Sequence, residues 1–96
     1  MRVDELLDQF ADALMAVSPD GAILYWSRGA ESLFGWSTEE AVGRVLLELV
    51  VPDDLREQAA REILDAVERG SATFEAPRRR KDGTIVHVDI SMRAVR

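Results

Sequence analysis

Few residues of this chain have side chains that could do covalent or acid–base chemistry, and they form no catalytic set. There is one histidine, His87, and no cysteine. The serines have no identifiable general base, and no pair of carboxylates flanks a recognisable cleft, so triad or acid–base catalysis is not supported. A metal site needs several ligands, and a single histidine on the polar face of a predicted strand is typical of a solvated position. We therefore expect no enzyme activity and no metal site.

The aromatic residues are concentrated in one stretch, SPDGAILYWSRGAESLFGWS, at residues 18–37. This stretch contains four of the six aromatics in the chain: Tyr25, Trp26, Phe34 and Trp36. Aromatics gathered near the start of a small acidic domain are hydrophobic core, the lining of a ligand pocket, or a surface for a partner. Composition and predicted elements decide between these interpretations only in part.

Composition limits the function classes. Ninety-six residues, 47% of them hydrophobic and 31% charged, are typical of one globular domain. Residues 1–69 hold six basic and fifteen acidic side chains, whereas residues 70–96 hold six basic and three acidic ones. An acidic body disfavours nucleic-acid binding, which needs a broad basic face.

The basic run Arg78–Lys81 precedes Asp82-Gly83, so we expect a solvated hairpin tip there. Without a membrane span or a signal peptide, a cytoplasmic location is expected.

The first half of the chain predicts an amphipathic helix, a hairpin and short helices. Val3, Leu6, Leu7 and Phe10 follow helical spacing within residues 1–11. Strands are predicted at 13–17 and 22–26, joined by an Asp-Gly turn. The helical pieces that follow are 28–34, ending at Gly35; 37–40, a capping box that stops at Gly43; and a buried segment at 45–50.

The second half predicts one longer helix and a second hairpin. Asp53 is the expected N-cap and Gly70 the end of the helix. Its predicted buried face comprises Leu55, Ala59, Ile63 and Val67, joined by Ala60 and Leu64. In the hairpin of 71–76 and 84–95, one face carries Val86, Val88, Ile90 and Met92, and the other carries His87, Asp89 and Ser91. Antiparallel hairpins with inserted helices predict an α+β domain with the helices on one sheet face.

Four motifs in this order resemble a PAS domain over residues 11–96. They are the hairpin and helix AVSPDGAILYWSRGAESLFGW, the segment EEAVGR, the segment VPDDLREQ and the hairpin RRRKDGTIVHVDIS. The resemblance implies a PAS-like antiparallel sheet at 12–96, preceded by the amphipathic helix at 1–11. It also implies a sensory or signal-relay module of a larger regulatory protein, such as a histidine kinase, that works by ligand sensing, dimerisation or both. A ligand-free dimerisation scaffold is the alternative.

Two departures from the family pattern matter. Ser27 replaces a common asparagine after the second strand, which we expect to loosen the local capping hydrogen bonds. The chain also ends at Arg96, where relatives continue into a fifth strand that lies between the first and fourth. We therefore expect a PAS domain truncated at its C-terminal strand, which has either re-paired its strands or is completed by a second molecule, as in a homodimer.

Cofactors can be compared with those of the family by position. A covalent flavin adduct and a cysteine-anchored chromophore are excluded, since the chain has no cysteine. Haem is not expected, since residues 53–69 contain no histidine. Noncovalent flavin or another small organic ligand stays open.

The resemblance turns Leu24 and Trp26 toward the helices, together with Met15 and Val17. It leaves Tyr25 and Trp36 near the surface. A pocket there would be lined by Trp26, Ala30, Phe34, Val50, Ile63, Val88 and Ile90. Filling of the core is favoured over an occupied pocket, because no unpaired polar group converges on this set.

The opposite face of the first strand carries Leu14 and Ala16, which is apolar for a solvent face. In this family the N-terminal helix packs there, within one chain or across a dimer. The resemblance thus implies a helix-mediated interface formed by Leu6, Leu7, Phe10 and Leu14, and a homodimer as the expected assembly.

Overall fold

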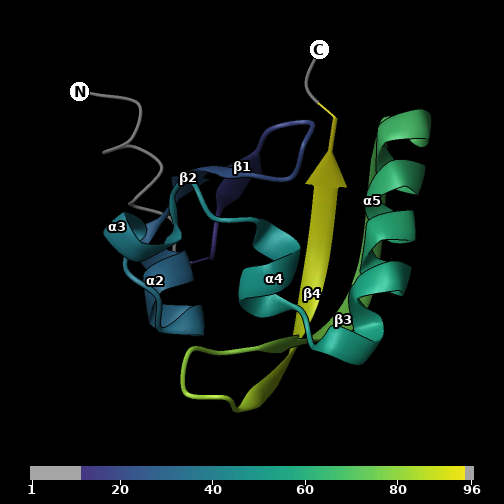
Figure 1. Ribbon diagram of the computed structural model, residues 1–96. Helices are drawn as coiled ribbons and strands as arrows, with labels where there is room; N and C mark the ends of the chain where they lie inside the picture. The colour runs from purple at the N-terminus through teal and green to yellow at the C-terminus, as the bar shows by residue number, and fades with distance from the viewer. Residues whose placement is uncertain (1–11, 95–96) are drawn as a thin grey trace.

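The computed structural model describes residues 12–94 and has two antiparallel hairpins connected by helices (Figure 1). The first hairpin and the short helices form one side of the molecule, and the long helix lies along the second hairpin. This arrangement confirms the predicted α+β class. In chain order the elements are β1 (Met15–Val17), β2 (Ile23–Trp26), α2 (Arg28–Phe34), α3 (Thr38–Ala41), α4 (Leu46–Val50), the 3-10 helix η1 (Asp53–Leu55), α5 (Arg56–Arg69), β3 (Ser71–Arg79) and β4 (Ile85–Arg93).

A register shift in the first hairpin changes which side chains face inward. Met15 pairs with Trp26 and Ala16 with Tyr25, but Val17 pairs with Ile23, so Leu24 is the extra residue of a bulge. Ile23 and Trp26 are therefore both buried, whereas Leu24 is 62% exposed. The predicted inward positions of Leu24 and Val17 are wrong, because they assumed uninterrupted alternation.

The short helices begin and end where local chemistry predicts. Ser27 caps α2, and Gly35 ends it with a φ of 84°, in the left-handed region that glycine adopts without steric cost. The predicted capping box of α3 is confirmed: Ser37 accepts from the amide of Glu40, whose carboxylate accepts from the amide of Ser37. The apolar segment at 45–50, whose hydrophobic residues show no clear periodicity, forms α4, with Leu49 and Val50 buried.

The long helix differs from its prediction at its start and in its buried face. Asp53 is not the N-cap, because η1 precedes α5, and Asp53 instead forms an ion pair with Arg56 at 2.9 Å. The buried residues of α5 are Ala59 and Ala66. Leu64 and Val67, predicted to be inside, are 63% and 47% exposed.

The second hairpin pairs β3 with β4 over nine residues, from Ser71 opposite Arg93 to Arg79 opposite Ile85. The predicted alternation of β4 is confirmed, with His87, Asp89 and Ser91 exposed and the residues between them half-buried. The prediction of a solvated hairpin tip is wrong in one respect. Arg78 is only 6% exposed, because it lies on the inner side of β3.

Within residues 12–94, the two hairpins form two separate sheets, and β1 and β4 each pair with one strand. Nothing in this pairing tests the expected completion by a fifth strand or a second molecule, which stays a prediction. The core cluster that lies between the hairpins includes Ile23, Trp26, Phe34 and Leu49, and Met15 and Val86 pack against it from the two sheets. No helix in the described part of the chain is long and apolar enough to cross a membrane.

Candidate functional site

Four of the seven predicted pocket residues lie together in the core. Trp26, Ala30, Phe34 and Val50 are each less than 5% exposed and belong to one cluster. The rings of Trp26 and Phe34 are tilted by 40° with centroids 5.6 Å apart, a favourable aromatic geometry. The indole N–H of Trp26 donates to the carbonyl of Trp36 at 2.9 Å, so this polar atom is already satisfied.

The other three predicted pocket residues lie elsewhere. Ile63, Val88 and Ile90 are half-buried on α5 and β4, outside the cluster of buried residues. From β4 it is Val86 that packs against the cluster. Sequence alternation placed Val86 on the correct face but gave no reason to prefer it over its neighbours. A ligand role for the seven residues stays a prediction.

Of the predicted interface residues, only Leu14 falls within the described part of the chain. It is half-buried, and its amide donates to the Ser27 side chain at 2.8 Å. Leu6, Leu7 and Phe10 lie outside the described residues. His87 is exposed on the outer face of β4, as its position in the sequence predicted.

Ser27 does more than cap a helix. Its side chain has no exposed surface and accepts from two amides, those of Ala30 at 3.1 Å and Leu14 at 2.8 Å. One hydroxyl thus fixes the start of α2 and holds the segment before β1 against it. The expected loosening of this cap is not observed, because the oxygen has two acceptor positions, and both are used.

The tip of the second hairpin docks on α2 and α3 through Lys81. Its amide donates to the carbonyl of Phe34 at 2.8 Å, and its ammonium binds the Glu40 carboxylate at 2.6 Å. The same ammonium lies 5.3 Å from the ring centroid of Trp36, within the range of a cation–π contact. We call these contacts the Lys81 junction. Sequence analysis missed it, because residues about forty positions apart meet there only in the folded chain.

The Lys81 junction changes the acidity of its carboxylate. The hydrogen bond from Lys81, supported by the amide of Ser37, lowers the pKa of Glu40 from 4.5 to about 2. On β3, burial lowers the pKa of Arg78, and the charge of Glu62 opposes this shift. Trp36 is only half-buried, but its indole N–H is inaccessible and has no acceptor among the described residues.

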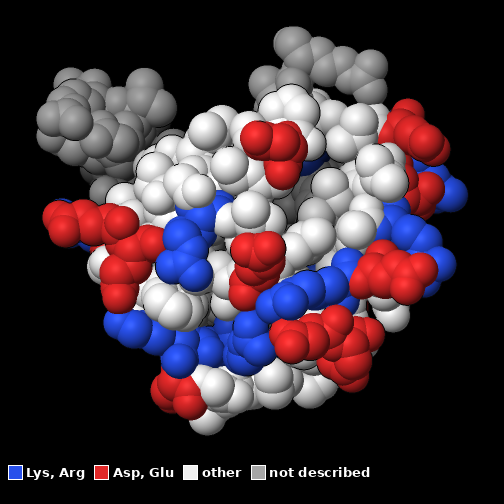
Figure 2. All heavy atoms as spheres, in the orientation of Figure 1, with Lys and Arg blue, Asp and Glu red and all other residues white. Residues whose placement is uncertain are grey.

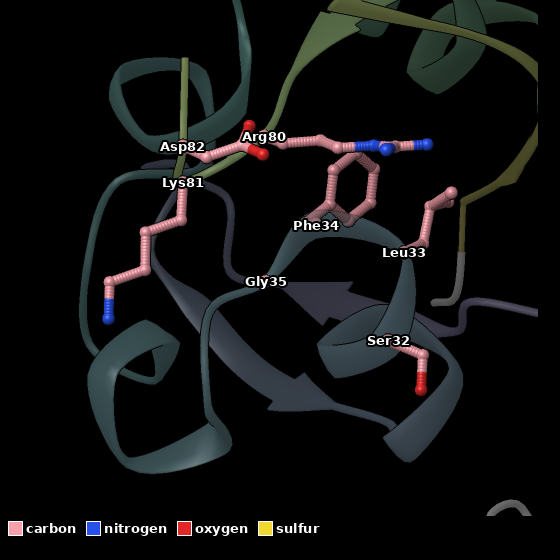
Figure 3. Close-up of a pocket in the computed structure, with 7 residues that line it drawn as sticks. All are labelled: Ser32, Leu33, Phe34, Gly35, Arg80, Lys81 and Asp82. Atoms are coloured by element: carbon pink, nitrogen blue, oxygen red, sulfur yellow. The ribbon is translucent and has the colours of Figure 1, made fainter. Parts of the chain in front are cut away.

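A hollow of about 530 Å³ lies beside the Lys81 junction, between the end of α2 and the hairpin tip. Figure 3 shows the Arg80 side chain extended across the Phe34 ring, with its guanidinium toward Leu33, while Lys81 points away. The Nε–H of Arg80 is buried and has no acceptor in the described part of the chain. A second hollow of about 410 Å³ lies between α5 and β3 and has a mostly charged and polar lining.

Charges are distributed unevenly over the face that carries these features. In Figure 2 the basic side chains form a band across the lower half of this face, and acidic side chains border the band. Ion pairs explain part of this pattern, since Arg79 and Arg56 both bind Asp53, at 3.6 Å and 2.9 Å. Among residues 12–94, no three histidine, aspartate or glutamate side chains come together as a metal site.

Comparison with known proteins gives consistent matches. The family model described as the PAS fold matches residues 2–96. A PAS domain from Colwellia psychrerythraea is 34% identical, with a TM-score of 0.82, over 88% of this chain and 72% of that one. No curated protein matches.

Two further solved structures are similar in fold at 18% identity. One is the PAS domain of a LuxR-family transcriptional regulator from Burkholderia thailandensis in complex with ethanol, with a TM-score of 0.81 over 100% of this chain and 85% of that one. The other is a PAS domain from a two-component sensor histidine kinase, with a TM-score of 0.77 over 92% and 75% of the two chains.

Proposed function

Since the chain belongs to the PAS family, whose domains serve as sensory and signalling modules, we propose that it relays signals within a larger regulatory protein. Similar PAS domains occur in a two-component sensor histidine kinase and in a LuxR-family transcriptional regulator, which supports a regulatory host. The proposed output is a change in the activity of an attached effector domain.

The Lys81 junction is the observation that supports a relay mechanism. Within the described residues the two hairpins share no strand pairing, so contacts outside the sheets must transmit movement between them. Lys81 attaches the β3–β4 tip to the last carbonyl of α2 and to the first turn of α3. A shift of the tip would therefore move both helices, or break the junction, which is the kind of physical coupling a relay needs.

The packed inner cluster favours a relay without a resident inner ligand. Trp26, one of the predicted pocket residues, is only 2% exposed, and its N–H is already bonded to the carbonyl of Trp36. A ligand would have to displace a large buried ring, which is costly in a close-packed core. Native mass spectrometry of protein purified from cells, compared with the denatured mass, checks this. Equal masses are expected, and an added stoichiometric mass would instead show an inner or surface ligand.

The signalling role itself is tested in the full-length parent protein. We expect Lys81→Gln to change the basal effector output or to remove its response, because it breaks the ion pair with Glu40 while retaining the hairpin turn. Arg61→Gln is the matched control, since it also removes one positive charge but at an exposed position on α5. Wild-type output from a folded Lys81→Gln variant would exclude a relay through the Lys81 junction.

A ligand-free dimerisation scaffold is the second candidate. The filled inner cluster fits it, and the first hairpin exposes two apolar side chains, Leu24 at 62% and Val17 at 37%. Leu24→Glu should then shift a dimer to monomer in sedimentation velocity, whereas Leu64→Glu, at an equally exposed leucine of α5, should not. A wild-type chain that is already monomeric would rule the scaffold out.

A further inference from the structure

The hollow beside Arg80 has features of a ligand site that the relay does not use. It lies between residues 32–35 at the end of α2 and residues 80–82 of the hairpin tip. Four of the seven inner pocket candidates belong to the core cluster, and of these only Phe34 also lines the hollow, where Leu33 packs against the cluster from its edge. The Phe34 ring meets Trp26 in the core and supports the Arg80 side chain at the hollow (Figure 3).

Arg80 is the basic group of the hollow whose charge is least neutralised. Lys81, the other basic residue there, is paired with Glu40 at 2.6 Å. No ion pair of Arg80 within 4 Å is found among the described residues, and its buried Nε–H has no acceptor there. This Nε–H is closed off from solvent like that of Trp36, so a ligand would bind Arg80 through its terminal Nη–H groups.

The one acidic residue of the hollow does not fill this role. Asp82 directs Oδ1 to the amide and hydroxyl of Thr84, at 2.9 Å and 2.6 Å, and these bonds are the main reason that its pKa is lowered. Arg80 contributes to this lowering only as a weaker, through-space charge. Asp82 therefore reduces the positive potential at Arg80 without occupying its hydrogen-bonding edge, and it disfavours a multiply charged anion.

These observations define the chemistry of a ligand. The two terminal Nη groups of a guanidinium present a planar fork of N–H donors that matches the two oxygens of a carboxylate. Leu33, half-buried beside the guanidinium, offers an apolar contact for the rest of the molecule. A hollow of about 530 Å³ is within the usual size range of small-molecule sites.

We propose that this hollow binds a small organic monocarboxylate, with its carboxylate on the Arg80 fork and its apolar body against Leu33. A bound ligand would contact both the end of α2 and the hairpin tip, the two elements that the Lys81 junction joins. The site would thus supply an input to the relay, and in this respect the proposal rests on the proposed function. Binding itself is independent of any effector and can be measured alone.

The test is an NMR titration of the 96-residue chain with phenylacetate, following backbone amides and the Nε–H of Arg80. We expect saturable shifts at Arg80 Nε–H and at the amides of Gly35 and Asp82. Phenylethanol, which lacks the charge, should bind with an affinity lower by about tenfold or more. Inorganic phosphate should not saturate the same signals. Equal binding of phenylethanol or phosphate would overturn the assigned ligand class.

Variants separate binding from folding. Arg80→Gln should weaken phenylacetate binding by about tenfold or more, and Arg80→Lys, which retains charge and side-chain length but not the fork, should also weaken it. Arg61→Gln, which removes an exposed charge on α5, should bind as the wild type does. Absence of saturable shifts, or shifts confined to the Trp26 cluster, would refute the site. A failure of the relay test in the parent protein would leave these shifts unchanged.

Discussion

At the scale of single residues, the Glu40–Lys81 pair links stability to pH. Lys81 lowers the pKa of Glu40 from 4.5 to about 2. A carboxylate whose pKa is lowered by folding stabilises the native state above its unfolded value, and this contribution disappears as the pH falls from 4.5 toward 2. We expect Glu40→Gln to lower the urea midpoint at pH 7 and to match the wild type near pH 2.

The control is Glu39→Gln, which removes the same charge from the neighbouring position of α3. Because Lys81 pairs with Glu40 and not with Glu39, Glu39→Gln should lower the urea midpoint at pH 7 less than Glu40→Gln does. A Glu40→Gln variant whose deficit persists unchanged at the lowest pH would show that packing, and not the ion pair, holds the Lys81 junction.

Ser27 provides the second prediction at this scale. Ser27→Ala would leave the amides of Ala30 and Leu14 without their acceptor in a fully buried position. We expect a loss of about 2–3 kcal/mol in the free energy of unfolding, measured by urea denaturation. Ser37→Ala removes a less buried cap that serves one amide, and should cost only about 1 kcal/mol. Equal losses in the two variants would contradict the double role of Ser27.

At the scale of elements, the docking of the hairpin tip on α2 can be tested with two glycines. Gly35 and Gly43 both have positive φ values, 84° and 89°. A Cβ on Gly35 would lie 3.4 Å from Cβ of Lys81, whereas a Cβ on Gly43 would have no neighbour within 4 Å. Both alanine variants should lose about 1–2 kcal/mol from backbone strain.

Only Gly35→Ala should also disturb the Lys81 junction. We expect the Lys81 amide and the side-chain signals of Glu40 to shift in NMR spectra of that variant, and a larger loss of stability than in Gly43→Ala. Identical stabilities together with an unshifted Lys81 amide would mean that the tip does not depend on close contact with α2.

The elements also show which features a sequence can predict. The capping box of α3 and the glycines that end α2 and α5 depend on residues within one turn, and all were predicted correctly. The bulge at Leu24 depends on cross-strand pairing, and the orientation of α5 depends on how it meets β3. Hydrophobic periodicity predicts neither the bulge nor the orientation of α5, so Leu24, Leu64 and Val67 were placed inside although they are exposed.

The candidate site follows the same division. Trp26, Ala30 and Phe34 were grouped correctly, because strand and helix spacing bring them to one side of adjacent elements. The Lys81 junction and the Arg80 hollow join residues more than forty positions apart. A basic run before an Asp-Gly turn is typical of a solvated tip. The neighbouring residues do not distinguish Arg78, whose side chain is buried, from Lys81, whose side chain binds Glu40.

At the scale of the whole molecule, the two hairpins depend on one shared core. Their sheets are separate within the described residues, yet Met15 of β1 and Val86 of β4 both pack against the cluster around Trp26. If this cluster holds the hairpins together, the domain should unfold as one cooperative unit, although its sheets do not share hydrogen bonds.

Trp26→Phe tests this cooperativity. It removes the hydrogen bond to Trp36 and part of a side chain that is only 2% exposed, so we expect a loss of about 1–3 kcal/mol. In native-state hydrogen exchange, the slowest amides of β3 and β4 should lose the same protection as those of β2, although Trp26 belongs to the other sheet. Leu24→Ala, at the exposed bulge position of the same strand, should leave both sets unchanged. Reduced protection in β2 alone would show instead that the β3–β4 hairpin with α5 is a separate folding unit, and that the relay must pass through the Lys81 junction without help from the core.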